Sequence, residues 1–150
     1  MIKADPRQRA WVEVDPSAIE ANAHNLRVQL AQGCLLMAVV KADGYGHGSE
    51  TVARAALQGG ANSLGVATLQ EGIDLRKVGI DSPILVLGNL TDAEELLACL
   101  HWDLMPTLSS DREALLCQNL AVGSGKNFSV QLKFDTGMTR LGCDFQDAPR

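Results

Sequence analysis

The sequence has little of what marks several large classes of protein. Its 13 lysine and arginine residues are outnumbered by 18 aspartate and glutamate residues, for a net charge of -5. Proteins that bind nucleic acid or anionic membrane carry a basic excess, so neither kind of partner is expected. No apolar run approaches the ~20 residues of a membrane span, and residues 1–6 carry charges where a signal peptide is apolar. The cytoplasm is the predicted compartment.

Cysteine and histidine are also scarce. The four cysteines lie far apart without a C-x-x-C pair, and none of the three histidines has metal-ligand spacing. We therefore expect reduced thiols and no metal site. Aromatic residues make up 4% of the chain, and Tyr45 is its single tyrosine, so it is the chain's one candidate for any step that needs a phenol.

What is present is an ordinary globular composition, 46% hydrophobic, in which short apolar runs alternate with segments of helical spacing. The runs that predict strands are residues 11–14, 35–40, 64–67, 83–88, 104–107 and 128–134. The segments that predict helices are residues 16–32, 49–57, 70–77, 93–100 and 111–120. From residue 35 onward this alternation predicts a parallel βα repeat of five strands.

Such a repeat can close as a barrel or open as a doubly wound sheet. Glycines 44, 46 and 48 lack the G-x-G-x-x-G spacing of the open dinucleotide fold. A barrel of eight units needs ~250 residues, and this chain supplies about five units. On the barrel interpretation the sequence is incomplete, and residues 147–150 resemble the start of a helix.

The first chemical motif is Lys41, which follows the apolar run 35–40 and precedes a glycine loop. Residues 35–40 show no polar alternation, which predicts a strand buried on both faces. A lysine that emerges from an apolar wall is partly desolvated, and its amine becomes nucleophilic. The alternative is a surface lysine with a buried stem. The glycines and the following helix N-terminus favour a phosphate, with the Tyr45 hydroxyl on it, unless Tyr45 is a half-buried loop aromatic.

The second motif, residues 132–142, follows the fifth predicted strand. In a closed barrel the ends of strands one and five open onto the same rim. Arg140 could there bind an anionic oxygen through its planar guanidinium, or it could pair with Asp135 or Asp144. Lys133 is a second cation at this rim and is repelled unless its charge is neutralised.

The two motifs resemble the signature segments of the alanine racemase family, whose enzymes carry pyridoxal phosphate (PLP) on a TIM-like barrel. Residues 38–48 resemble A-V-V-K-A-N-A-Y-G-H-G and depart from it at Asp43 and Gly44. Residues 133–142 match every fixed position of K-x-D-T-G-M-x-R-L-G. The resemblance implies a TIM-like (β/α)8 barrel, with about five of its eight strands in this chain.

The resemblance also implies roles for individual residues. Lys41 would hold PLP covalently and act as the base that exchanges the α-proton on the face serving D-alanine. Tyr45 would bind the cofactor phosphate, and Leu85 and Leu87 would form an apolar wall beside the cofactor.

Three residues of the second motif also receive implied roles. Arg140 would contact the PLP phenolic oxygen and the substrate carboxylate, with the Met138 backbone beside the substrate. Lys133 matches a lysine that is carbamylated in family members. A carbamate is negative and would hold Arg140 by a charge-assisted hydrogen bond, which would remove the repulsion.

The implied function is racemisation of L- and D-alanine by a cytoplasmic homodimer, supplying D-alanine for cell-wall synthesis. In the family the opposing base is a tyrosine of a C-terminal β-domain of the other subunit, so we expect this chain alone to be inactive. Residues 1–14 would belong with that absent domain, and residues 15–150 would be the first part of the barrel. Two alternatives are a non-catalytic PLP-binding barrel of cofactor homeostasis and an aldolase-type barrel without PLP.

Overall fold

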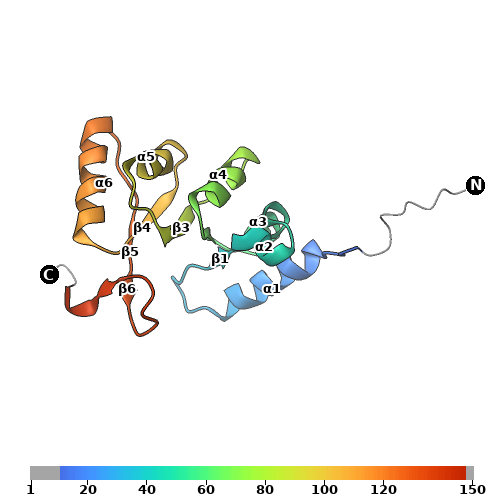
Figure 1. The fold of residues 1–150 in the computed structure, drawn as a ribbon. Helices are drawn as coiled ribbons and strands as arrows, with labels where there is room; N and C mark the ends of the chain where they lie inside the picture. Colours follow the sequence, from blue (N-terminus) through green and yellow to red (C-terminus); the bar gives the residue numbers. More distant parts are fainter. Residues whose placement is uncertain (1–10, 148–150) are drawn as a thin grey trace, which may run out of the picture.

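Five parallel strands that pair in the order of the chain form the body of the protein (Figure 1). They are β1 (Met37–Val39), β2 (Ser63–Val66), β3 (Ile84–Asn89), β4 (Met105–Leu108) and β5 (Gln131–Leu132). The structure is a computed structural model and describes residues 11–147. A doubly wound sheet would reverse its strand order at one point, whereas this order is that of part of a (β/α)8 barrel. The predicted parallel repeat is confirmed.

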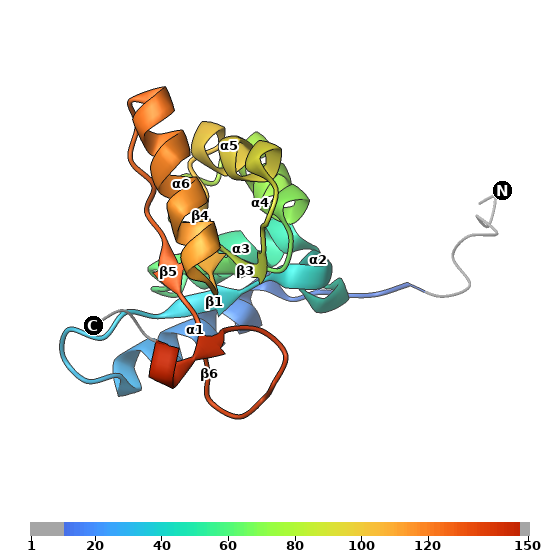
Figure 2. The same ribbon diagram turned by 60° about the vertical axis from the view of Figure 1, so that its left-hand side comes forward.

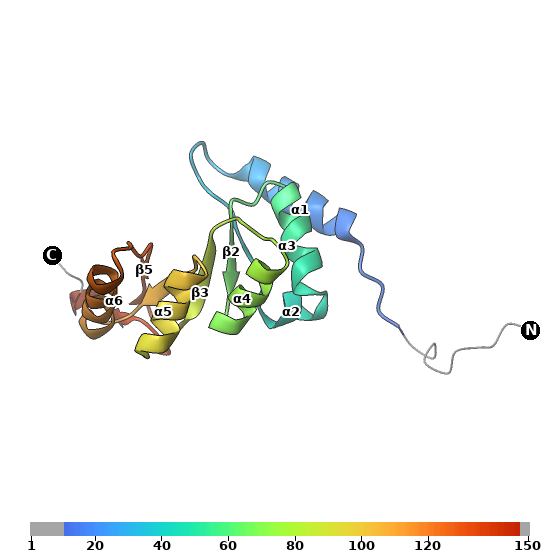
Figure 3. The same ribbon diagram turned by 90° about the horizontal axis from the view of Figure 1, so that it is seen from above.

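Helices cover one side of the sheet. They are α1 (Pro16–Gln29), α2 (Lys41–Gly46), α3 (Ser49–Gln58), α4 (Leu69–Lys77), α5 (Ala93–His101) and α6 (Asp111–Ser124). α1 precedes β1, and the others come after strands. Seen from above, α3 to α6 cross the sheet in sequence order, and α1 lies beside α3 (Figure 3). α1, α5 and α6 start where the sequence predicts and α4 starts one residue earlier, because Asp15, Asp92, Ser110 and Thr68 cap their first turns, whereas α2 was not predicted. None of these helices is long and apolar enough to cross a membrane.

The hydrophobic core lies between the helices and the facing side of the strands. Leu64, Val66, Ile84 and Val86 are all 0% exposed and alternate along β2 and β3. The residues between them point to the opposite side, which in a barrel is the interior. Figure 2 shows a second, two-stranded sheet and its loop set apart from α4 and α5.

The predicted strand at residues 35–40 is shorter and less buried than expected. β1 holds only three residues, and Leu35 before it is 76% exposed. Val39 is 39% exposed because it lies on the side of the sheet away from the helices. The prediction of a strand buried on both faces is therefore wrong for β1 in this chain, although Val40 enters the core at 1% exposure.

Residues 11–14, predicted as a strand whose sheet partners belong to a β-domain outside this chain, form no strand here. They run away from the sheet as exposed chain, with Trp11 71% and Val12 78% exposed (Figure 1). Residues 1–10 and 148–150 lie outside the described part, and with them most of the predicted N-terminal segment and of the helix start at residues 147–150. That residues 1–14 belong with a β-domain stays a prediction.

The fifth predicted strand divides at Lys133. Its first part is β5, and its second part is β6 (Phe134–Asp135), which pairs with β7 (Cys143–Asp144) ahead of a short 3-10 helix, Phe145–Asp147. Lys133 joins the two sheets because its N–H donates to the Leu108 carbonyl while its own carbonyl accepts from the Cys143 N–H. Residues 136–142 form the loop between β6 and β7.

The four cysteines, Cys34, Cys99, Cys117 and Cys143, are free thiols, as predicted. Burial raises the pKa of Cys99 to about 12, with smaller contributions from Cys117 and Glu95. A thiol with so high a pKa stays protonated at neutral pH and is a poor nucleophile.

Candidate functional site

Lys41 lies at the carboxyl end of β1, where parallel βα folds collect their catalytic groups. Its side chain is half-buried. The four residues that follow it, Ala42, Asp43, Gly44 and Tyr45, all have φ between 51° and 61°, so they form one turn of left-handed helix. This conformation costs roughly 1–2 kcal/mol for each residue that is not glycine. A strained backbone of this kind persists only where its surroundings hold it.

Hydrogen bonds within the loop supply part of that hold. The Gly44 N–H donates to the Val40 carbonyl at 2.9 Å, and the Gly48 N–H donates to the Asp43 carbonyl at 2.9 Å. The Asp43 carboxylate accepts from the Ser49 N–H at 2.8 Å, at the start of α3. The side chain of Asp43 therefore ties the left-handed turn to the helix that follows it.

The same bonds limit which N–H groups of the glycine loop are available to a phosphate. Those of Gly44, Gly48 and Ser49 donate within the loop itself, so the phosphate site expected at this loop and the N-terminus of α3 stays a prediction. A carboxylate, that of Asp43, already lies at the start of α3. Tyr45, the other residue assigned to the phosphate, keeps its side chain 60% exposed.

Glu71, at the start of α4, also binds the left-handed turn, and we did not select this residue from the sequence. One carboxylate oxygen of Glu71 accepts from the Ala67 and Thr68 N–H groups, at 2.7 and 3.1 Å, and completes a capping box at the start of α4. The other oxygen accepts from the Ala42 N–H at 2.7 Å. The T-x-x-E pattern at residues 68–71 signals the cap, but nothing in it signals the contact with Ala42.

A similar glutamate bridge occurs two βα units later, between the ends of β3 and β4. Glu113 is 7% exposed and occupies the third position of α6. Its carboxylate accepts from the Ser109 N–H at 2.6 Å and from the Asn89 side-chain amide at 3.4 Å. A glutamate near the start of a helix thus links two neighbouring strand ends at two places on this edge of the sheet.

The side of the sheet away from the helices is apolar near Lys41. A Cβ atom on Gly65 would lie 3.4–3.5 Å from side-chain atoms of Met37, Val39 and Leu87, so these three gather over that glycine. Leu85 pairs with Gly65 in the register of β2 and β3 and is 4% exposed. Lys41 comes two residues after Val39, just past the end of β1. A lysine at the border of this apolar surface fits the needs of PLP, whose aldehyde bonds an amine and whose ring packs on apolar groups.

Lys133 reaches the same surface from the far edge of the sheet. Its Nζ donates to the Leu87 carbonyl at 3.4 Å. The structure thus brings together two residues of the predicted site that are 46 positions apart in the sequence. Its ammonium group is bound by a backbone carbonyl, which lessens the repulsion expected between Lys133 and Arg140.

Met138 and Arg140 lie on the exposed loop between β6 and β7. The loop is anchored by Asp135, whose carboxylate accepts from the Gly137 and Thr139 N–H groups at 2.9 Å each. The bonds from Thr139 and then Gly137 lower the pKa of Asp135. Within residues 11–147 Arg140 forms no ion pair with Asp135 or Asp144, which was the alternative role considered for it.

Lys41 and the second motif follow the two edge strands of the sheet, β1 and β5. In a closed barrel of eight these two strands lie on opposite sides of the interior. No hydrogen bond or ion pair in the described range joins Lys41 to Lys133 or Arg140. The site is therefore open between its two parts in this chain.

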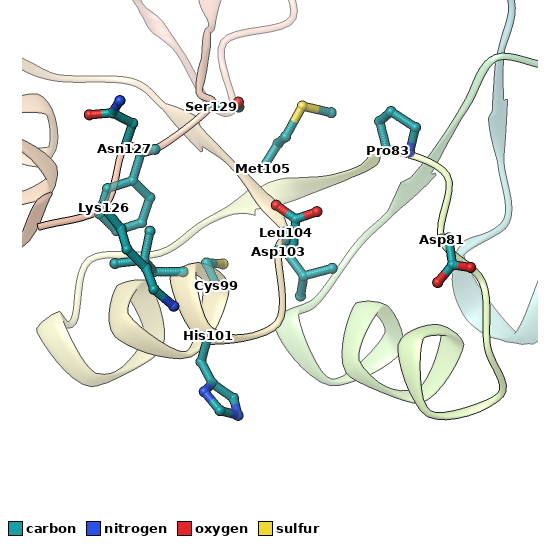
Figure 4. Close-up of a pocket in the computed structure, with 12 residues that line it drawn as sticks. Asp81, Pro83, Cys99, His101, Asp103, Leu104, Met105, Lys126, Asn127 and Ser129 are labelled. Atoms are coloured by element: carbon teal, nitrogen blue, oxygen red, sulfur yellow. The ribbon is translucent and has the colours of Figure 1, made fainter. Parts of the chain in front are cut away.

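A cavity of about 530 Å³ lies at the other end of the sheet (Figure 4). Its lining includes Asp81, Cys99, Asp103, Lys126 and Ser129, which precede or flank the starts of β3, β4 and β5. In barrels this amino-terminal end serves stability rather than catalysis. The cavity is therefore separate from the Lys41 site.

Comparison with known proteins agrees with this geometry. The sequence profile described as "Alanine racemase, N-terminal domain" matches residues 14–150. A protein of Prochlorococcus marinus named alanine racemase is 69% identical over 96% of this chain and 37% of its own length. One of Synechocystis with the same name is 51% identical over 95% of this chain and 38% of its own length.

Solved structures show the same relationship. The crystal structure of alanine racemase from E. faecalis superposes with a TM-score of 0.81 at 39% identity, over 87% of this chain and 35% of that one. The crystal structure of alanine racemase from Bacillus anthracis with bound L-Ala-P superposes with a TM-score of 0.81 at 35% identity, over 89% of this chain and 34% of that one. The chain thus spans just over a third of the length of these relatives.

Proposed function

From the premise that this chain belongs to the alanine racemase family, we propose that it is the cofactor-carrying part of an enzyme that interconverts L- and D-alanine. The observation that carries the proposal is a half-buried lysine, Lys41, at the carboxyl end of β1 beside an apolar surface that includes Leu87. We further propose that the whole protein acts in the cytoplasm as a homodimer and supplies D-alanine for cell-wall synthesis.

The residues around β1 and β3 provide the cofactor site in this proposal. PLP, when bound, supplies an electron sink for the carbanion left by removal of the α-proton. Lys41 would hold it through its amine, and the same amine would move the α-proton on one face of the substrate. Tyr45 donates its exposed hydroxyl to the phosphate, and Leu85 and Leu87 exclude water from one side of the ring.

The second motif orients the substrate. Arg140 binds the substrate carboxylate and the ring oxygen through its planar guanidinium, because two parallel donors fix both position and angle. The loop anchored by Asp135 presents the Met138 backbone beside the substrate. The neutral amine of Lys133 would add CO₂ and release a proton, and the carbamate formed would steady Arg140 in place of the present bond to the Leu87 carbonyl.

Racemisation needs a second base on the other face of the substrate. Tyr45 is the single tyrosine of this chain and is assigned to the phosphate, so the opposing base comes from outside these residues. We therefore propose that the 150 residues alone are inactive, and that activity requires the parts of the protein that match the rest of the relatives' length.

The test is racemisation of L-alanine by the whole protein, followed by chiral chromatography. Wild-type protein supplied with PLP should convert L-alanine to a mixture of both enantiomers, and Lys41→Ala should not. Whole protein that binds PLP but leaves L-alanine unchanged would favour the alternative of a non-catalytic PLP carrier. The relatives described above are named alanine racemase and give no support to that alternative.

A further inference from the structure

We propose that Glu71 is a positioning residue for Lys41, acting through the backbone of Ala42. The inference rests on the proposed function, because it concerns how the lysine is held for the cofactor. Its basis is one hydrogen bond of 2.7 Å, between a Glu71 carboxylate oxygen and the N–H of the residue next to Lys41.

The bond acts within the strained left-handed turn. Ala42 has φ 51° and ψ 51°, and it is the first residue of the left-handed turn. An alanine reverts to right-handed or extended backbone unless something outside it opposes the change. Rotation of this peptide would swing the Lys41 Cα and its side chain, so the carboxylate that fixes the Ala42 N–H also fixes the direction of the lysine.

Glu71 is itself held in place by a separate set of bonds. Its second oxygen accepts from the Ala67 and Thr68 N–H groups, while the Glu71 N–H donates to the Thr68 hydroxyl at 3.3 Å. These bonds belong to the first turn of α4, which is rigid because Gly72 and Leu75 are buried in the core. Lys41 at the end of β1 is thus aligned by Glu71, which is held at the neighbouring end of β2.

The two oxygens can be separated by experiment. In Glu71→Gln one oxygen remains to accept the bonds of the capping box, and the amide that replaces the other cannot accept from the Ala42 N–H. Glu113→Gln is the matched control, because Glu113 links β3 to β4 in a similar way and the residue it reaches is Asn89, not one beside a lysine.

The experiment measures PLP dissociation constants and melting temperatures of the apoenzyme for the whole protein. Glu71→Gln should weaken PLP binding by about tenfold, the effect of losing one hydrogen bond to a charged group. Both variants should lower the melting temperature of the apoenzyme by similar amounts. Glu113→Gln should leave the PLP dissociation constant within about twofold of wild type.

A second variant tests the mechanism. Glycine adopts positive φ without strain, so Ala42→Gly added to Glu71→Gln should recover part of the lost affinity. The proposal is overturned if Glu71→Gln binds PLP like wild type, if Glu113→Gln weakens binding equally, or if Ala42→Gly recovers nothing. It is also overturned if Glu71→Gln fails to fold. Wild-type protein that binds no PLP would instead refute the proposed function.

Discussion

The Asp135 carboxylate holds the loop that carries Met138 and Arg140. It is exposed, yet its pKa is lowered because the Thr139 and Gly137 N–H groups donate to its charged form. The folded pKa lies below the ordinary value of 3.8, so above that value the carboxylate is charged and stabilises the loop fully. This stabilisation is lost as pH falls through the lowered pKa.

We predict that the Thr139 amide is protected from hydrogen exchange at neutral pH and loses that protection when Asp135 protonates in acid. Exchange measured by NMR between neutral pH and about pH 2 checks this. Asp135→Ala should show no protection of this amide relative to its intrinsic exchange rate at any pH, and Asp144→Ala, whose carboxylate binds the Gln146 N–H instead, is the control. Thr139 protection that does not change in Asp135→Ala would contradict the account.

Single residues also show what the sequence can and cannot predict about the site. Lys41 was found because it is the charged residue after an apolar run, and Arg140 because it lies in the motif that follows the fifth predicted strand. Glu71 was not found, because its decisive partner is the backbone of Ala42, 29 positions away, and a backbone amide leaves no pattern in a sequence. The left-handed turn was hidden for a related reason, since Ala42 and Tyr45 do not favour that conformation themselves.

At the scale of elements, the second motif forms a small unit of its own. β6 and β7 pair through Phe134 with Cys143 and Asp135 with Asp144, and Gly142 lies against them. Gly142 has φ +114°, and a Cβ atom there would come 2.6 Å from the Asp135 backbone nitrogen. The last glycine of the motif is therefore required by close packing of two backbones.

We predict that Gly142→Ala opens this pairing and destabilises the protein by about 1–3 kcal/mol, through overpacking and positive φ. Gly123→Ala is the matched control. It lies in α6 with nothing within 4 Å of the added Cβ, so it should stabilise by about 0.5–1 kcal/mol. Urea unfolding of both variants measures the difference, and equal effects would contradict this view of the motif.

Arg76 joins elements at the opposite end of the sheet. Its guanidinium donates to four backbone carbonyls in two loops, those of Ile80 and Ser82 and those of Trp102 and Asp103. Desolvation lowers its pKa, an effect opposed by Asp103 and Asp81, yet the group stays charged. A planar fork of donors suits this arrangement, and the single ammonium of lysine does not.

We predict that Arg76→Lys destabilises the protein by about 2 kcal/mol, because it leaves carbonyls without their donor. The Kd for PLP should stay unchanged, since Arg76 lies far from the strand end that carries Lys41. Lys77→Gln, which removes only an exposed pair with Asp74, should change stability by less than about 0.5 kcal/mol. Thermal unfolding measures both, and a Lys77→Gln effect as large as that of Arg76→Lys would refute the assignment.

At the scale of the whole molecule, the strand order was predictable because βα alternation allows few arrangements. The extent to which the strands are buried could not be predicted from the sequence. The apolar spacing of β1 is the same whether or not its inner side is covered, so Leu35 and Val39 were predicted buried and are 76% and 39% exposed. Exposure of the inner side agrees with a chain that spans just over a third of its relatives' length.

Whether Lys41 carries the cofactor can be tested chemically. Whole protein loaded with PLP is reduced with borohydride, digested and analysed by mass spectrometry. The account predicts a phosphopyridoxyl group on Lys41 and none on Lys133. A label on Lys133 or another lysine, or no stable label in protein that binds PLP, would contradict it.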